Sequence, residues 1–291
     1  MRWEMGRRSE NVEDRRGMGG GGLGRGVQVG GLGGLGLVAV ALIAMFLGID
    51  PSVVLNSIPM DDQSSAPAST PRSGPPAGDR QADFVSAVLA QTEDAWQAQF
   101  AQMGRRYQDP QLVLFDGQVN SACGLAGSAT GPFYCPGDQK LYLDMSFFDE
   151  LDRRFGAPGD FARAYVIAHE VGHHVQTLLG VTGEVDRLRR QLGRSEANQL
   201  SVMTELQADC FAGVWARQAN QSQHILEPGD IEAGLRAASA VGDDRIQKAT
   251  QGYVVPDAFT HGSSAQRMRW FKTGLDSGTI EACDTFNAPQ L

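Results

Sequence analysis

His169-Glu170-Val171-Gly172-His173 is the pentapeptide from which the rest of this chain can be interpreted. It lies in residues 161–179, which contain no proline and carry apolar residues at helical spacing, so we expect a helix there. Positions i and i+4 of a helix are neighbours, and both imidazoles can therefore bind one metal ion. Glu170 lies beside them, where it can take a proton from a water molecule at the metal. This is the zincin arrangement for Zn²⁺, and its alternative is a helix with incidental surface histidines.

A catalytic zinc ion usually has three protein ligands, so the two histidines need a third partner. Glu205 and Asp209 are four residues apart in residues 195–218, a segment rich in helix formers, and so share one helix face. We expect Glu205 to bind the metal and Asp209 to accept the N–H of a ligand histidine, which would fix the ring tautomer. Apolar neighbours favour this hypothesis over a solvated helix face, because buried carboxylates need a partner. His174 points about a hundred degrees away from His173 and is not expected to be a ligand.

Another candidate group lies near the C-terminus. Ser263 or Ser264 can cap a helix that runs through Arg267, which places His261 in the turn before that helix. Peptide hydrolysis develops negative charge on the carbonyl oxygen, and an imidazole or a guanidinium can stabilise it. We predict this role for His261 and Arg267; the alternative is an ordinary capping loop with an incidental histidine.

Several segments carry a family resemblance: Asn11 to Arg16 before a glycine run, Gly131 to Pro136, His169 to Gln176, Glu205 to Cys210, and His261 to Ser264 with Gln266 and Arg267. In these segments the chain resembles the putative neutral zinc metallopeptidase family, bacterial proteins with a short N-terminal membrane anchor and an extracytoplasmic zincin domain. The resemblance implies that His169 and His173 bind one Zn²⁺ ion, that Glu170 is catalytic and that Glu205 is the third ligand. It also implies a peptide or protein substrate.

The N-terminal part divides by composition. Residues 1–28 form a basic, glycine-rich tail, and residues 29–49 carry no charge and are long enough to cross a bilayer core of about 30 Å as a helix. The arginines before this span predict a cytoplasmic N-terminus. We therefore expect a single-pass signal anchor in the inner membrane, with the catalytic domain periplasmic or extracellular; a cleaved signal peptide is the alternative. Residues 59–81 are expected to be a flexible linker, and residues 83–291 the folded domain.

All 4 cysteines follow the predicted span, which agrees with export. Cys123 and Cys135 flank a glycine-rich loop that a disulfide would close. By elimination, Cys210 can pair with Cys283 and so tie the C-terminus to the helix that carries Glu205. The alternatives are cysteine metal ligands, for which no Cys-x-x-Cys spacing exists, and a buried free thiol at Cys210.

Periodicity predicts a mostly helical α+β domain of the zincin type with a small β-sheet. The expected helices span residues 84–106, 146–155, 161–179, 182–192, 195–218, 230–250 and 264–274, and the expected strands span residues 111–119 and 140–144. Because zincins commonly bind extended substrates along a strand edge, we expect the strand at 140–144 to offer its edge to a peptide. The alternative for that segment is a plain core strand.

The net charge of −9 argues against a nucleic-acid partner, and the chain has no P-loop or dinucleotide-binding motif. We therefore predict a membrane-anchored zinc endopeptidase that acts outside the cytoplasm, with zinc-activated water as nucleophile and Glu170 as general base. The alternatives are a non-catalytic envelope-assembly protein that retains a metal site and a zinc amidase that acts on cell-wall peptides. Glu170 argues against the first, because a structural metal site has no need of it.

Overall fold

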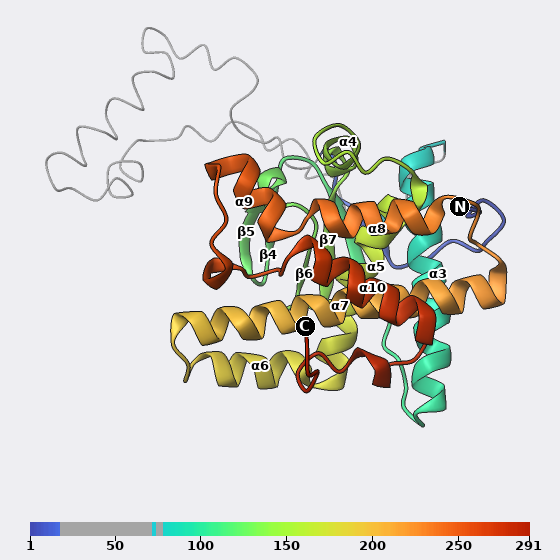
Figure 1. Cartoon of the computed structure of the whole chain (residues 1–291). Coiled ribbons are helices and arrows are strands. Elements are labelled where there is room, and N and C mark those ends of the chain that lie inside the picture. Colours follow the sequence, from blue (N-terminus) through green and yellow to red (C-terminus); the bar gives the residue numbers. More distant parts are fainter. Residues whose placement is uncertain (18–71, 74–77) are drawn as a thin grey trace, which may run out of the picture. The chain divides into compact units, whose positions relative to one another are not determined.

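The computed structural model describes residues 1–17, 72–73 and 78–291 (Figure 1). The predicted anchor at residues 29–49 lies outside the described residues, as does most of the predicted linker. None of the helices in the described ranges combines the length and the hydropathy that a membrane span requires. Met1–Arg16 and the chain from Pro71 to Leu291 form one compact unit.

A five-stranded mixed sheet has the order β2-β1-β3-β7-β6, and a separate hairpin consists of β4 and β5. Strands β1, β3 and β7 run parallel to one another, whereas β2 and β6 run antiparallel to their neighbours. The strand bounds are β1 Val12–Asp14, β2 Arg72–Ser73, β3 Gln111–Phe115, β4 Gln118–Ser121, β5 Gly124–Gly127, β6 Phe133–Cys135 and β7 Lys140–Asp144.

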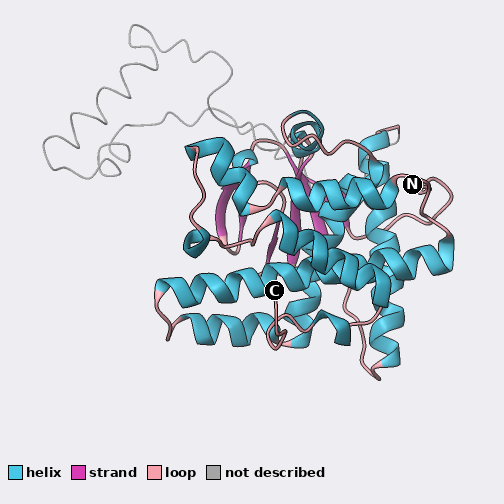
Figure 2. Ribbon diagram, viewed as in Figure 1, coloured by secondary structure: helices cyan, strands magenta, loops and turns pink. Residues whose placement is uncertain are grey.

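Helices dominate the unit; in the view of Figure 2 some of them cross in front of the sheet and others lie beside it. Their bounds are α3 Arg80–Gln102, α4 Ser146–Arg153, α5 Asp160–Leu179, α6 Val181–Arg189, α7 Arg194–Gln223, α8 Asp230–Ala240, α9 Asp243–Gln251 and α10 Ser264–Ser277, with short 3₁₀ turns at η1 Ser128–Thr130, η2 Pro256–Ala258 and η3 Glu281–Cys283. The prediction of a mostly helical α+β fold with a small sheet is confirmed.

Helix α5 is central, since it contacts β6 and β7 as well as α3, α7 and α8. Its residue Gly172 allows a close approach to α7, because a Cβ atom there would lie 2.9 Å from the carbonyl oxygen of Ala208. Gly274 has the same role between α10 and α7, where a Cβ atom would overlap the carbonyl of Cys210. Both glycines bring backbones together at the level of the predicted metal ligands.

The predicted helix over residues 230–250 is wrong, because the chain forms two helices, α8 and α9, with a break at Val241 and Gly242. The loop before α10 packs against this break. A Cβ atom at position 242 would lie 2.5 Å from the backbone nitrogen of Ser264, so the residue there must be small. The break makes Asp243 the first residue of α9.

Met1–Arg16 lies within the folded unit, which differs from the predicted tail over residues 1–28. Strand β1 pairs with β3, and Trp3 is buried and donates its indole N–H to Asp160 at 3.0 Å. Arg16 forms ion pairs with Asp14 at 2.6 Å and with Asp79 at 2.7 Å. A strand paired with β3 lies on the same side of a membrane as β3, so this pairing places Met1–Arg16 with the folded domain.

Strand β7 has no free edge, because β3 pairs with one side of it and β6 with the other. The prediction that residues 140–144 offer an edge to substrate is therefore wrong. The edge strand next to β7 is β6, which contacts α5, and β2 forms the other edge of the sheet.

Two disulfides join Cys123 to Cys135 and Cys210 to Cys283, in agreement with the expected pairing. The first connects the β4–β5 hairpin to β6, and the second connects α7 to the C-terminal segment. Disulfides persist in oxidising compartments, so the two bonds indicate an extracytoplasmic domain.

Candidate metal centre

Helices α5 and α7 bring the three predicted metal ligands together. The Nε2 atom of His169 lies 3.2 Å from one carboxylate oxygen of Glu205, and the Nε2 atom of His173 lies 3.4 Å from the other. One ligand atom from each of the three side chains lies within 4.8 Å of the other two. The spacing of the two histidines on α5 is thus matched by a carboxylate from a helix 36 residues later in the chain.

Asp209 fixes the orientation of the first imidazole. Its Oδ1 atom accepts the Nδ1–H of His169 at 2.9 Å, so Nε2 is the ring nitrogen that faces Glu205 and that a metal would bind in place of a proton. Burial alone would lower the pKa of His169, but the charge and the hydrogen bond of Asp209 outweigh it and raise this pKa to about 10. Carboxylates that favour a proton on the ring equally favour a divalent cation at this place. The sequence prediction for Asp209 agrees with this geometry.

Arg267 lies at the wall of the cleft, and its guanidinium group is directed at Asp209. Its Nε and Nη2 atoms donate to the two oxygens of Asp209 at 2.8 and 2.9 Å, and Nη1 donates to the carbonyl of Val241 at 3.2 Å. Tyr165 also donates its hydroxyl to Asp209. Burial would raise the pKa of Asp209, but the charge of Arg267 holds it below its usual range. Arg267 is only 3% exposed, so this geometry favours a positioning role over the predicted contact with an oxyanion.

Gln176 orients the second imidazole, and sequence reasoning missed it. Its Oε1 atom accepts the Nδ1–H of His173 at 2.8 Å, which again leaves Nε2 for the metal. The signal was present, since Gln176 follows His173 by three residues on the same helix and such pairs are neighbours. His174, by contrast, is buried and bonds the carbonyl of Gln108 at 2.7 Å, so it supports the fold and not the metal.

Glu170 points into the same cleft and is 9% exposed. Burial disfavours the charged carboxylate, and this is the largest cause that raises the pKa of Glu170 to about 7. The positive charge of a protonated His169 acts in the opposite direction. A carboxyl group with a pKa near neutrality can both accept and return a proton, which is the requirement for a general base.

His261 lies in the loop before α10 and faces the same cleft, with half of its side chain exposed. Asp243 holds this loop: its Oδ2 atom accepts the backbone N–H groups of Thr260, His261 and Gly262 at 2.7, 2.6 and 3.1 Å. Its Oδ1 atom lies 3.2 Å from Nδ1 of His261. Two acceptors would repel each other there, so Nδ1 carries the proton. The hydrogen bond to Asp243 raises the pKa of His261.

The cleft has a volume of about 880 Å³. Its lining includes the three ligands, Glu170 and His261, together with residues of β6, α4, α6 and α9. The donor set fits zinc, because two imidazoles with a free Nε2 and one carboxylate are a known ligand set of catalytic zinc sites. Among the described residues, this trio is the one group of histidine, cysteine and acidic side chains that is compact enough to hold a metal.

Comparison with known proteins agrees with this donor set. Residues 1–286 match the model of a family described as "Putative neutral zinc metallopeptidase". The chain is 50% identical over 289 residues to Uncharacterized protein YpfJ of Escherichia coli strain K12. The aligned residues make up 98% of this chain and 99% of the relative. It is 44% identical over 258 residues to Uncharacterized protein Rv2575 of Mycobacterium tuberculosis strain H37Rv. Here the aligned residues make up 85% of this chain and 86% of the relative. No solved structure gives a significant match.

Proposed function

Because this chain belongs to the putative neutral zinc metallopeptidase family, we propose that it is a zinc endopeptidase of the zincin type. The observation that carries the proposal is the convergence of two imidazoles and one carboxylate beside a buried fourth side chain, Glu170, in a single cleft. A purely structural metal site would need only the first three groups. A buried carboxyl group with a raised pKa is the additional feature that hydrolysis requires.

In this proposal His169, His173 and Glu205 hold one Zn²⁺ ion, which would polarise the scissile carbonyl and make water more acidic. Glu170 takes the proton of the attacking water and passes it to the leaving amine. His261 lines the cleft, and in its imidazolium form, which the hydrogen bond to Asp243 favours by raising its pKa, it donates Nε2–H to the negative charge that develops on the carbonyl oxygen. Arg267 contributes indirectly, through Asp209 and the tautomer of His169.

The outer edge of β6 is the surface that we assign to the peptide substrate. In the described part of the chain, β6 pairs with β7 on one side and with no strand on the other. Gly131, Phe133 and Tyr134 line the cleft, so the open edge of β6 is continuous with the metal centre. An extended peptide can add to such an edge through backbone hydrogen bonds, which bind a peptide without requiring a particular sequence.

We place this activity outside the cytoplasm, in line with the two disulfides. Attachment to the membrane through residues 29–49 stays part of the proposal. It takes a different form from the predicted single crossing, because β1 requires Met1–Arg16 to lie on the same side as the catalytic residues.

The test is hydrolysis of an unfolded protein such as casein by the purified full chain. We expect cleavage that a chelator abolishes and that added Zn²⁺ restores. The Glu170→Gln variant should bind zinc like the parent protein and lose at least about a hundredfold in rate, the lower end of what a general base contributes. Zinc content is measured by atomic emission in both proteins. Cleavage by Glu170→Gln at the parental rate would refute the proposal.

A further inference from the structure

A continuous chain of hydrogen bonds connects His173 to the C-terminal segment. His173 donates Nδ1–H to Gln176, and Gln176 in turn donates from Nε2 to Oε1 of Gln207 at 3.1 Å. Gln207 then donates from Nε2 to the backbone carbonyl of Cys283 at 3.0 Å. Gln176 is fully buried and Gln207 is 8% exposed, so water does not compete with these bonds.

The direction of this chain is determined at its far end by backbone carbonyls. A carbonyl can only accept, so the amide group of Gln207 must turn its NH₂ toward Cys283 and its oxygen toward Gln176. Gln176 must therefore present its NH₂ to Gln207, and it also donates to the carbonyl of Thr204 at 2.7 Å. Its oxygen is left to face His173. The tautomer that frees Nε2 of His173 for a metal is thus supported by two backbone carbonyls, that of Thr204 directly and that of Cys283 through Gln207.

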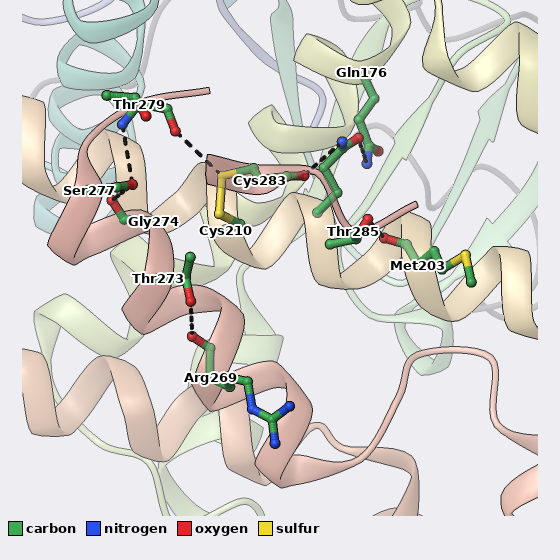
Figure 3. The surroundings of a disulfide bond; sticks show 11 residues. Gln176, Met203, Cys210, Arg269, Thr273, Gly274, Ser277, Thr279, Cys283 and Thr285 are labelled. Carbon is green, nitrogen blue, oxygen red and sulfur yellow. Dashed lines mark hydrogen bonds between the residues drawn. A yellow bond between two sulfur atoms is a disulfide. The ribbon is translucent and has the colours of Figure 1, made fainter. Parts of the chain in front are cut away.

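A disulfide holds that carbonyl in place. Cys283 is bonded to Cys210, which follows Gln207 by three residues and so lies on the same face of α7. Figure 3 shows the bond between α7 and the C-terminal segment, with Gln176 close to Cys283. Two residues later the segment contacts α7 again, where Thr285 donates its hydroxyl to the carbonyl of Met203 at 2.7 Å. Without the disulfide, the chain near residue 283 would be held to α7 only by hydrogen bonds and side-chain packing.

We propose that the Cys210–Cys283 disulfide acts through Gln207 and Gln176 as a positioning device for His173, so that zinc binds with full affinity only in the oxidised protein. The proposal rests on the metal site of the proposed function. Forming the bond removes two electrons and two protons from two thiols, and the disulfide of a thiol–disulfide oxidoreductase accepts them as it becomes a dithiol. A chain that is still in the reducing cytoplasm would then hold zinc weakly, which restrains hydrolysis until export.

Zinc affinity of the full chain, measured by competition with a chromophoric chelator, tests this proposal. We expect the Cys210→Ala/Cys283→Ala variant to bind zinc about 10- to 100-fold more weakly, the usual effect of losing a partner of a ligand histidine. The matched control is Cys123→Ala/Cys135→Ala, which removes the other disulfide and should leave zinc affinity unchanged. Alanine is preferred to reduction, because free thiolates and thiol reductants themselves bind zinc.

The Gln207→Leu variant separates this route from general loss of stability. With the disulfide intact, it should weaken zinc binding to the same degree, and in the Cys210→Ala/Cys283→Ala background it should add no further loss. Parental affinity in either variant, or losses that add, would overturn the proposal. If the disulfide variant fails to fold, Gln207→Leu alone decides in the same way. Since the readout is metal affinity, the result stands whether or not the protein cleaves peptides.

Discussion

The two walls of the cleft are built by opposite means. The metal wall consists of His169, His173 and Glu205 on α5 and α7, and each histidine has its Nδ1–H held by a buried side chain. The facing wall is the loop of residues 260–262, which presents His261. His169 is 7% exposed, whereas the His261 side chain is 51% exposed and its loop is held chiefly by one carboxylate, that of Asp243.

In the proposed function, this difference means that the metal wall determines the affinity for zinc and the facing wall affects the catalytic rate. Ligand orientation on the metal wall is determined by several hydrogen bonds at once, as a tight metal site requires. In the proposed function, the facing wall meets a charge that exists only in the transition state, and there a single well-placed donor is sufficient. Changes in the metal wall should therefore alter zinc binding, and changes in the facing wall should alter turnover with zinc retained.

The largest difference between the effect on turnover and the effect on zinc binding is expected for His261→Asn. This substitution keeps an N–H near Asp243 but removes Nε2, so kcat should fall about 10²- to 10³-fold, as for loss of an oxyanion donor. Zinc content should equal that of the parent protein. His224→Asn is the matched control, because His224 is exposed and has a positive φ that asparagine tolerates. A large loss of zinc in His261→Asn would show that the two walls are not independent.

Asp209→Asn examines the metal wall. The amide keeps the size of the carboxylate but removes the charge that faces His169 and Arg267, so zinc affinity should fall about 10- to 100-fold. At saturating zinc, most of the activity should return. Asp276→Asn, at an exposed ion pair on α10, serves as the control. Unchanged zinc affinity in Asp209→Asn would contradict the role assigned to this wall.

A smaller effect is expected for Asp243→Asn, because the amide can still accept some of the backbone hydrogen bonds. Loss of the contact with Nδ1 of His261 should cost about 1 kcal/mol, or roughly a fivefold decrease in kcat, with little change in KM. In the His261→Asn background the decrease should be much smaller. Equal decreases in both backgrounds would mean that Asp243 acts on the fold and not through His261.

The smallest effect is expected in the pH dependence of kcat/KM. Glu170 must be deprotonated to act as a base, so activity should be lost as the pH falls through the pKa of Glu170. Burial raises that pKa from 4.5 to about 7, whereas a divalent cation nearby lowers it. We therefore expect an acid limb with an apparent pKa below about 7. A pH–rate profile at fixed zinc occupancy measures it, and the same acid limb in the residual activity of Glu170→Gln would exclude Glu170 as the base.

The metal wall could be predicted from the sequence because its parts repeat at helical spacing. His169 with His173 and Glu205 with Asp209 are each four residues apart, and the buried neighbours of Glu205 indicated a partner. Asp243 and Gln207 could not be found in this way. Asp243 acts across 18 residues of chain, and its position depends on a helix break that the packing of Gly242 against Ser264 produces. Gln207 acts on a backbone carbonyl, which leaves no trace in side-chain patterns.

Strand β1 was missed because it is three residues long and lies in a segment whose flanking arginines resemble those of a basic tail. These arginines are paired within the fold, as in the contacts of Arg16 with Asp14 and Asp79. The prediction of a cytoplasmic N-terminus assumed that these arginines carry unpaired positive charge, and that assumption does not apply to them. Parallel pairing with a strand about 100 residues later is a tertiary contact, and local periodicity carries no information about it.

The Arg16–Asp79 contact also has a practical consequence for recombinant production. A protein that began at residue 83 would lack Trp3 and Val12 from its core and would leave β3 with an open edge, a template for aggregation. The two side chains lie 2.7 Å apart, so a short glycine-rich turn can replace the intervening chain and join Arg16 directly to the start of α3. Such a shortened protein would keep β1 paired with β3 and should aggregate less than the simple truncation.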